Sequence, residues 1–145
     1  MQYRLFLTIF SFMVLSSCAV EPAPIEYGKD VCSFCKMNIV KKQYGAELVT
    51  KKGKVYKYDA IECMLNDIKD KDEAEIELFL VNTYDFPETL NNAVKSTFLI
   101  SEAMSSPMGA NLTAFKDGLT AKSTKEEKGG EIYNWEELKI KFTNK

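Results

Sequence analysis

The chain has 145 residues, a formal net charge of −2 and no histidine, and 46% of its residues are hydrophobic. A mildly acidic chain without a basic run interleaved with aromatic residues lacks the footprint of a nucleic-acid-binding protein. The lack of histidine excludes the Ser-His-Asp triad, the usual imidazole general base and every metal site that uses imidazole.

The N-terminus has the pattern of an export signal, with Arg4 followed by an apolar run over residues 5–15. A positive charge, a short apolar run and a small-residue cleavage site are typical of such signals. A helix over residues 5–15 would be ~17 Å long, which is too short to cross a hydrocarbon core of ~30 Å. The segment is therefore predicted to be a removable signal. Leu-Ser-Ser-Cys at 15–18 resembles a bacterial lipobox, in which the cysteine becomes the first mature residue and carries lipid. A plain secretory signal with an incidental cysteine is the alternative.

We therefore divide the chain into a signal peptide over residues 1–17, a lipidated tether over 18–30 and one folded domain over 31–145. The tether contains Pro22 and Pro24, which prevent a helix and favour a short stiff segment. This division predicts a membrane-anchored bacterial lipoprotein that faces the periplasm or the exterior.

The first half of the domain is predicted to form a β-β-α-β unit. Asp59 is the expected N-cap of its helix, in which Met64 lies on the apolar face and packs in the core. In chain order we expect strand residues at 38–40 and 46–50, a turn at 51–54, a strand at 55–58, a helix at 60–69 and a strand at 76–84.

The second half repeats this pattern. Gly129 and Gly130 are expected to stop its polar helix, and Asn134 to cap a last helix that carries Trp135. In chain order we expect strands at 93–101 and 111–115, a helix at 117–127 and a strand at 131–133. The sequence thus predicts an α+β fold of two β-β-α-β units in one compact domain.

The sequence contains a cluster of sulfur-containing residues that could bind a metal ion. Cys32, Cys35 and Met37 lie within six residues, directly before the first predicted strand. Cys63 follows in the first helix, and Met108 lies in a Pro-Met-Gly turn that would hold it out of the core. Thiolate and thioether are soft donors that prefer monovalent copper, whereas divalent copper, manganese and magnesium prefer imidazole or carboxylate.

Other interpretations of the cysteines remain open. Cys32 and Cys35 outside the cytoplasm are compatible with a structural disulfide or with a thioredoxin-like redox pair, although no strand is predicted before them and no helix after them. A structural zinc site needs about four ligands, whereas the domain has three cysteines. Cys63 is also compatible with a buried inert thiol. It points ~100° away from Met64, so we expect that both side chains cannot face inward fully.

Four blocks resemble the conserved blocks of the NosL family, the copper lipoproteins of nitrous oxide reductase assembly. They occur in the family's order and span essentially the whole mature chain, at residues 32–39 (Cys-Ser-Phe-Cys-Lys-Met-Asn-Ile), 58–65 (Tyr-Asp-Ala-Ile-Glu-Cys-Met-Leu), 106–115 (Ser-Pro-Met-Gly-Ala-Asn-Leu-Thr-Ala-Phe) and 129–138 (Gly-Gly-Glu-Ile-Tyr-Asn-Trp-Glu-Glu-Leu). The resemblance implies paired β-β-α-β units and one bound Cu(I) ion. It also implies handover to the maturation machinery of nitrous oxide reductase, including a membrane ABC-type transporter.

The resemblance also implies a ligand set. Cys35 and Met37 are the first choices, with Cys32 beside them, Met108 approaching from the second unit and Cys63 as a lesser candidate. Lys36 departs from the family block, which commonly has glycine there, and the histidine that members often carry near the first cysteine is absent. This chain is therefore expected to use an all-sulfur site.

These observations predict a copper chaperone rather than an enzyme. It would hold Cu(I) through cysteine and methionine sulfur and pass it to nitrous oxide reductase and its transporter. The main alternative is an extracytoplasmic thiol-disulfide oxidoreductase that uses Cys32 and Cys35. An enzyme like organomercurial lyase, whose fold is thought to be related, ranks last.

Overall fold

The computed structural model describes residues 20–143, so the predicted signal peptide and Cys18 lie outside the described residues. No helix within residues 20–143 is both long and apolar enough to cross a bilayer. The elements are β1 (Ala46–Thr50), β2 (Val55–Tyr58), α1 (Ile61–Asp67), β3 (Ile76–Asn82), β4 (Leu90–Asn92), β5 (Thr97–Ile100), β6 (Leu112–Phe115), α2 (Gly118–Lys128), β7 (Glu131–Tyr133) and α3 (Trp135–Thr143), with short 3₁₀ turns at Ile68–Asp70, Glu73–Glu75 and Ala93–Lys95.

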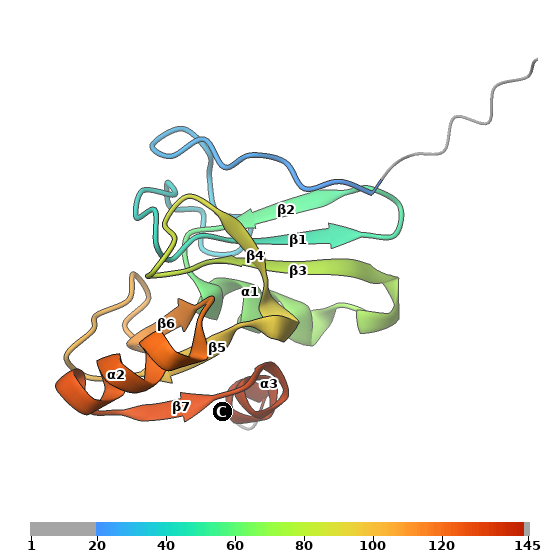
Figure 1. The fold of residues 1–145 in the computed structure, drawn as a ribbon. Helices are drawn as coiled ribbons and strands as arrows, with labels where there is room; N and C mark the ends of the chain where they lie inside the picture. The colour runs from blue at the N-terminus through green and yellow to red at the C-terminus, as the bar shows by residue number, and fades with distance from the viewer. Residues whose placement is uncertain (1–19, 144–145) are drawn as a thin grey trace, which may run out of the picture.

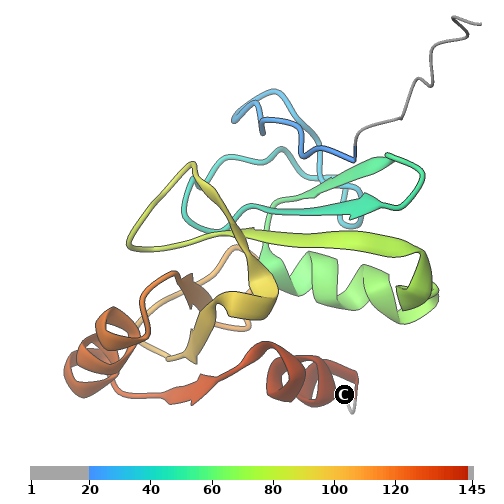
Figure 2. The same ribbon diagram turned by 45° about the vertical axis from the view of Figure 1, so that its right-hand side comes forward.

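The strands form two antiparallel sheets with the orders β2-β1-β3-β4 and β6-β5-β7. In each sheet a hairpin is followed by a helix, and the next strand then pairs with the first strand of the hairpin. The predicted α+β fold of two β-β-α-β units is therefore confirmed, with β4 added at the edge of the first sheet. Figures 1 and 2 show α1 on the side of the first sheet that faces the second half of the chain.

One aromatic side chain joins the two halves of the core. Trp135, the first residue of α3, is buried, and its ring centroid lies 5.3 Å from that of Phe79 in β3 and 5.8 Å from that of Phe98 in β5. A tryptophan in contact with both sheets buries a large apolar area. The two units therefore share one core, as a single compact domain requires.

The N-cap predicted for α3 in the second unit is confirmed, whereas the N-cap predicted for α1 in the first unit is wrong. Asn134 caps α3 as predicted, because its Oδ1 accepts the backbone N–H of Glu137 at 3.0 Å. Asp59 does not cap α1, which begins after Ala60 without a side-chain cap. The Asp59 carboxylate instead accepts the backbone N–H of Val40 at 3.3 Å and so holds the preceding loop.

Two predicted strand segments are wrong, and one strand was missed. Residues 38–40 do not form a strand, and their β-pairing consists of an isolated bridge between Asn38 and Val31. Residues 93–95 form a 3₁₀ turn, because the Asn92 side chain accepts the backbone N–H of Lys95 at 3.3 Å. The missed strand β4 exists through its pairing with β3.

The segment before residue 31 contacts the domain. The backbone N–H of Ala23 donates to Glu47 of β1 at 3.0 Å, and Lys57 of β2 donates to the Pro24 carbonyl at 2.7 Å and to Asp30 at 2.6 Å. In Figure 1 this segment runs above the first sheet, on the side away from the second sheet. It therefore covers the outer ends of Glu47 and Lys57.

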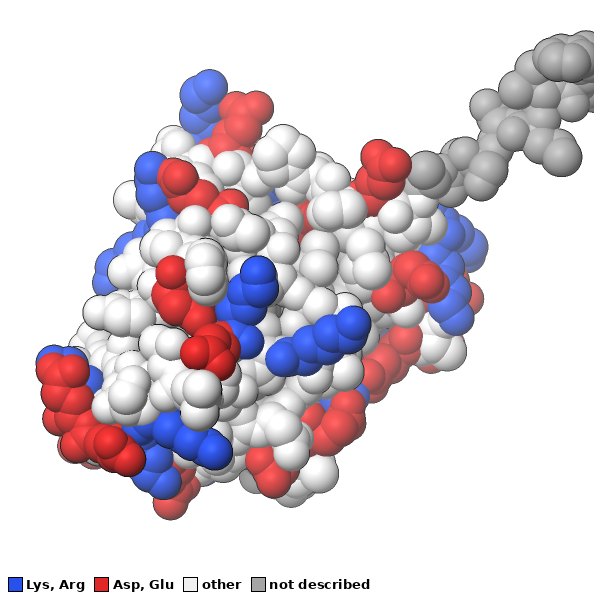
Figure 3. Space-filling view, viewed as in Figure 1, with Lys and Arg blue, Asp and Glu red and all other residues white. Residues whose placement is uncertain are grey.

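The surface carries both signs of charge. Figure 3 shows lysine and acidic side chains interspersed on the face in view, without a broad area of one sign. The face in view therefore lacks a broad positive area that would attract nucleic-acid phosphates.

Candidate metal centre

Three cysteines from two separate parts of the fold meet at one place. The Sγ atoms of Cys32, Cys35 and Cys63 all lie within 4.8 Å of one another. Cys32 and Cys63 are fully buried, whereas Cys35 is half-buried. The cluster is therefore reached from solvent on the side of Cys35.

The loop that carries Cys32 and Cys35 is closed by its own backbone. The N–H of Cys32 donates to the carbonyl of Met37 at 2.8 Å, and the N–H of Lys36 donates to the carbonyl of Cys32 at 3.1 Å. Lys36 takes a left-handed conformation with φ of 64°, which suits glycine better than lysine. The N–H of Ser33 donates to a carbonyl of β2 at 2.7 Å and fixes the loop to the first sheet.

This loop turns backbone N–H groups toward the sulfur of Cys32. The pKa of Cys32 is lowered, first because the thiol of Cys63 donates to its sulfur. Backbone N–H groups at Phe34, Cys35 and Asp59 lower it further, against the opposing effect of burial. Cys32 is therefore the sulfur that holds the negative charge of the cluster.

The other two thiols keep their protons. The pKa of Cys63 is raised, first because its proton is donated to Cys32 and then by burial. Burial raises the pKa of Cys35, although the backbone N–H of Met37 favours its thiolate. The resting cluster therefore carries one thiolate and two thiols, and a bound ion would replace protons.

The spacing of the sulfurs suits one soft ion. Three thiolates each about 2.3 Å from an ion, the zinc–thiolate distance, are about 4.0 Å apart when they form a trigonal plane around it. The three sulfurs lie within 4.8 Å of one another, so shortening their separations by less than about 1 Å would bring all three to one ion. Three sulfur donors with no imidazole match the preference of Cu(I).

The two methionine candidates lie on exposed loops. The side chains of Met37 and Met108 are 55% and 41% exposed. Met108 lies in the predicted tight turn, in which the N–H of Gly109 donates to the carbonyl of Ser106 at 3.1 Å. The Ser106 hydroxyl donates to Glu62 of α1, the neighbour of Cys63. Met37 therefore lies in the loop that carries Cys32 and Cys35, and Met108 lies in a loop that is tied to α1. Their role as ligands stays a prediction.

The prediction for Cys63 and Met64 was wrong in one respect. Both side chains are fully buried, because residues on every side of α1 from Ile61 to Leu65 are covered. A helix that is covered all round can bury neighbouring residues that point in different directions. Met64 packs in the core as expected, and Cys63 completes the thiol cluster.

The two cysteines of the Cys-x-x-Cys pair lie in a turn rather than at the start of a helix. The first helix after them is α1, which begins at Ile61. A thioredoxin-like pair lies at the start of a helix that follows a buried strand, so the local structure differs from that arrangement.

The NosL family model matches residues 23–143. The chain belongs to the NosL family. A crystal structure of the copper chaperone NosL from Shewanella denitrificans has the same fold, with a TM-score of 0.71 and 20% sequence identity over 81% of this chain and 95% of that chain. No curated protein matches the chain. The resemblance seen in the four sequence blocks is thus confirmed, and NosL membership agrees with the paired β-β-α-β units.

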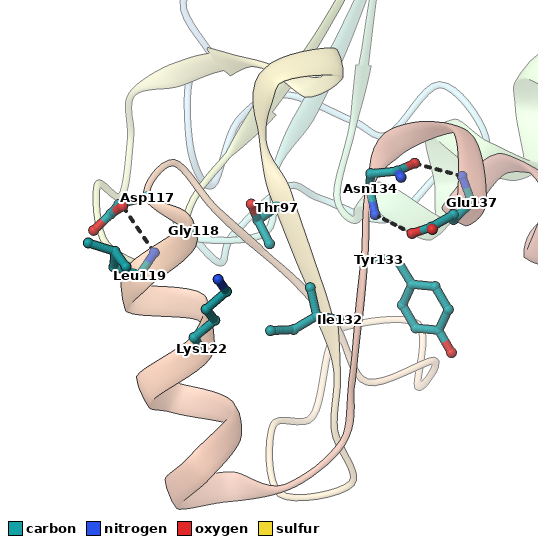
Figure 4. A pocket seen from close by; sticks show the side chains of 9 residues that line it. All are labelled: Thr97, Asp117, Gly118, Leu119, Lys122, Ile132, Tyr133, Asn134 and Glu137. Carbon is teal, nitrogen blue, oxygen red and sulfur yellow. Dashed lines mark hydrogen bonds between the residues drawn. The ribbon is translucent and has the colours of Figure 1, made fainter.

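One hollow of this NosL-family domain lies away from the cysteines. Figure 4 shows it between α2, β7 and the start of α3, with Leu119 and Lys122 on one side and Tyr133 on the other. Its acidic groups are already engaged. Asp117 accepts the N–H of Leu119 at 3.1 Å, and Glu137 accepts the N–H of Asn134 at 2.9 Å. No sulfur lines this hollow, so we assign no metal to it.

Sequence reasoning missed Glu62 and Ser106, which join the Met108 loop to α1. The available signal was an acidic residue at Glu62 between apolar Ile61 and Cys63, in a helix whose other early positions are apolar. A charged residue in such a place needs a partner.

Proposed function

We propose that the protein is a carrier of monovalent copper, with sulfur ligands drawn from Cys32, Cys35, Cys63, Met37 and Met108. The observation that carries this proposal is the convergence of three sulfurs within 4.8 Å, with one of them half-exposed. Membership of the NosL family supports it, as does the name of the solved relative, which is a copper chaperone.

Uptake and release would proceed by exchange of single copper–sulfur bonds. The Cys32 thiolate offers the first bond, and Cys35 and Cys63 each lose a proton to solvent as their bonds form. Delivery reverses these steps, because an incoming thiolate or thioether of the recipient replaces one sulfur at a time on the side of Cys35. The oxidation state of copper does not change, so no electron donor or acceptor is needed.

The proposal includes a location and a recipient. A lipid on Cys18 would attach the protein to a bacterial membrane, facing the periplasm or the exterior. The recipient would be nitrous oxide reductase together with its ABC-type maturation transporter. The lipobox and the four family blocks support both parts of this proposal.

A Cu(I) titration of the reduced protein against a competing chelator tests the carrier function. We expect Cys35→Ser to weaken retention by more than about tenfold, because ligand loss exceeds the 10- to 100-fold effect typical of groups that only orient a ligand. Met37→Leu and Met108→Leu are expected to weaken it as well. Met64→Leu is the matched control, since Met64 packs in the core and should leave retention unchanged.

The same variants separate this function from thiol-disulfide exchange. An oxidoreductase would keep its exchange rate in Met37→Leu and Met108→Leu, because methionine takes no part in that reaction. Copper retention by Cys35→Ser at the wild-type level would contradict the carrier proposal.

A further inference from the structure

Glu62 is a charged residue with almost no access to water. Its side chain belongs to the second residue of α1, directly before Cys63, and the residue is 2% exposed. Burial raises the pKa of Glu62, although hydrogen bonding from Ser106 opposes this effect. Burying a carboxylate costs free energy that a well-packed apolar side chain would not cost. Stability alone therefore does not account for an acid at this position.

The contacts of Glu62 lead to a single loop. The Ser106 hydroxyl donates to its Oε1, and Ser106 is itself only 6% exposed. The backbone N–H of Ala110 also interacts with the carboxylate. Ser106 and Ala110 lie two residues before and two residues after Met108. Ser106 thus ties the start of the turn that presents Met108 to α1, and the backbone N–H of Ala110, after Met108, favours the charged form of the same carboxyl group.

The second carboxylate oxygen of Glu62 also lies in an unfavourable environment. Oε2 of Glu62 is buried and has no hydrogen-bond partner among the residues that the structure describes. An unpaired buried acceptor is costly, so the fold tolerates this group rather than gaining from it. The hydrogen bond that the Glu62 side chain makes within residues 20–143 is the one from the Ser106 hydroxyl.

We propose that Glu62 is a positioning residue that holds the Met108 turn against α1, beside Cys63, and thereby sets the distance between the Met108 thioether and the thiol cluster. Neighbouring side chains on a helix diverge by about 100°, so the turn that Glu62 holds lies to one side of the Cys63 thiol. Met108 stands on the exposed part of that turn, with a flexible side chain that can reach sideways. This inference rests on the proposed copper function.

The test uses the full reduced protein with ¹³C-labelled methionine methyl groups and follows the Met108 methyl signal during Cu(I) addition. Copper–thiolate absorption in the ultraviolet is recorded on the same samples. In the wild type we expect both the absorption and a large shift of the Met108 signal. In Glu62→Ala we expect the absorption to remain and most of the Met108 shift to be lost.

Two further variants make the result specific. Glu62→Gln keeps an oxygen that accepts from Ser106 and should restore the Met108 shift. Ser106→Ala removes one fastening of the turn, leaves α1 intact and should reduce the shift; it takes the place of Glu62→Ala if that variant does not fold.

The possible outcomes separate the two proposals. A wild-type Met108 shift in both Glu62→Ala and Ser106→Ala would overturn the positioning role. Copper–thiolate absorption without any Met108 shift in the wild type would also overturn it, while leaving the thiol site standing. Absence of the absorption in the wild type would instead overturn the proposed function itself.

Discussion

Cys32 differs from the other two thiols because the loop prepares it as a thiolate before any ion arrives. Backbone N–H groups and the Cys63 thiol lower the pKa of Cys32, whereas the pKa values of Cys35 and Cys63 are raised. A thiolate is the form that binds metal and attacks a disulfide. The first copper–sulfur bond can therefore form without removal of a proton, and the next two release protons.

Lys36 bears on the stability of this loop. Its left-handed backbone with φ of 64° costs a non-glycine residue roughly 1–2 kcal/mol. Its Nζ donates to the Ser33 carbonyl at 2.5 Å. This hydrogen bond is exposed to solvent and therefore contributes little to stability. We expect Lys36→Gly to raise the free energy of unfolding by up to about 1 kcal/mol, part of the gain being lost to the entropy of glycine in the unfolded chain. Urea denaturation of the reduced protein measures this.

A lysine in an ordinary turn supplies the control. Lys51 is exposed, follows β1 and has no positive φ. Lys51→Gly should lower the free energy of unfolding, since glycine gains nothing there. Equal signs for the two lysine variants would contradict the strain at Lys36.

At the scale of elements, the sequence predicted those whose cause is local. The hairpin of β1 and β2, the helix α2 and the capped helix α3 all follow from alternation, turn residues and caps near to them in the chain. Residues 38–40 were misread because Ile39 is apolar, yet its backbone pairs with the preceding loop. Its N–H donates to Asp30 at 2.9 Å, and its carbonyl accepts from Gly28 at 2.7 Å. No local pattern carries that information.

The candidate site divides in the same way. The chemistry of Cys32, Cys35 and Met37 could be predicted from their spacing, because a single turn can bring together sulfur donors that lie within six residues. The place of Cys63 could not, since it depends on how the loop packs on β2 and α1. The tie between Glu62 and Ser106 joins residues 44 positions apart and follows only from the docking of the two units.

The strand β1 carries a buried acid that makes stability depend on pH. Glu47 is fully buried where residues 23–30 cross the outer face of the first sheet, and burial raises its pKa to about 7. The ordinary value is about 4.3, so the folded state binds more protons than the unfolded state between pH ~4.3 and ~7. The contribution of Glu47 to the free energy of unfolding is therefore largest below pH ~4.3 and falls as the pH rises towards ~7.

Urea denaturation at pH 5 and at pH 8 tests this expectation. The effect should be on the order of 1–3 kcal/mol, and Glu47→Gln should remove it while keeping the bond from Ala23. Glu77→Gln is the control, because Glu77 is an exposed acid on β3. A pH dependence that survives in Glu47→Gln would show that another group is responsible.

For the molecule as a whole, Trp135 makes the two sheets one cooperative unit. It is 2% exposed, and its ring packs at a tilt against rings from both sheets. We expect Trp135→Ala to lower the free energy of unfolding by about 3–5 kcal/mol. Far-ultraviolet circular dichroism during urea denaturation measures this and should show a single transition in the wild type.

Ile140 on the same helix is the matched control. Its side chain is 61% exposed, so Ile140→Ala should change the free energy of unfolding by no more than about 0.5 kcal/mol. Two separate transitions in the wild type would contradict the shared core.

The fastening of Ala23 to β1 has a consequence for how far the domain can travel. With the lipid that we propose on Cys18, five residues of chain lead from the lipidated residue to the backbone N–H of Ala23, and five residues span about 18 Å at most. The domain would then stay close to the lipid headgroups. A recipient would have to bind the protein within that distance of the membrane to receive copper.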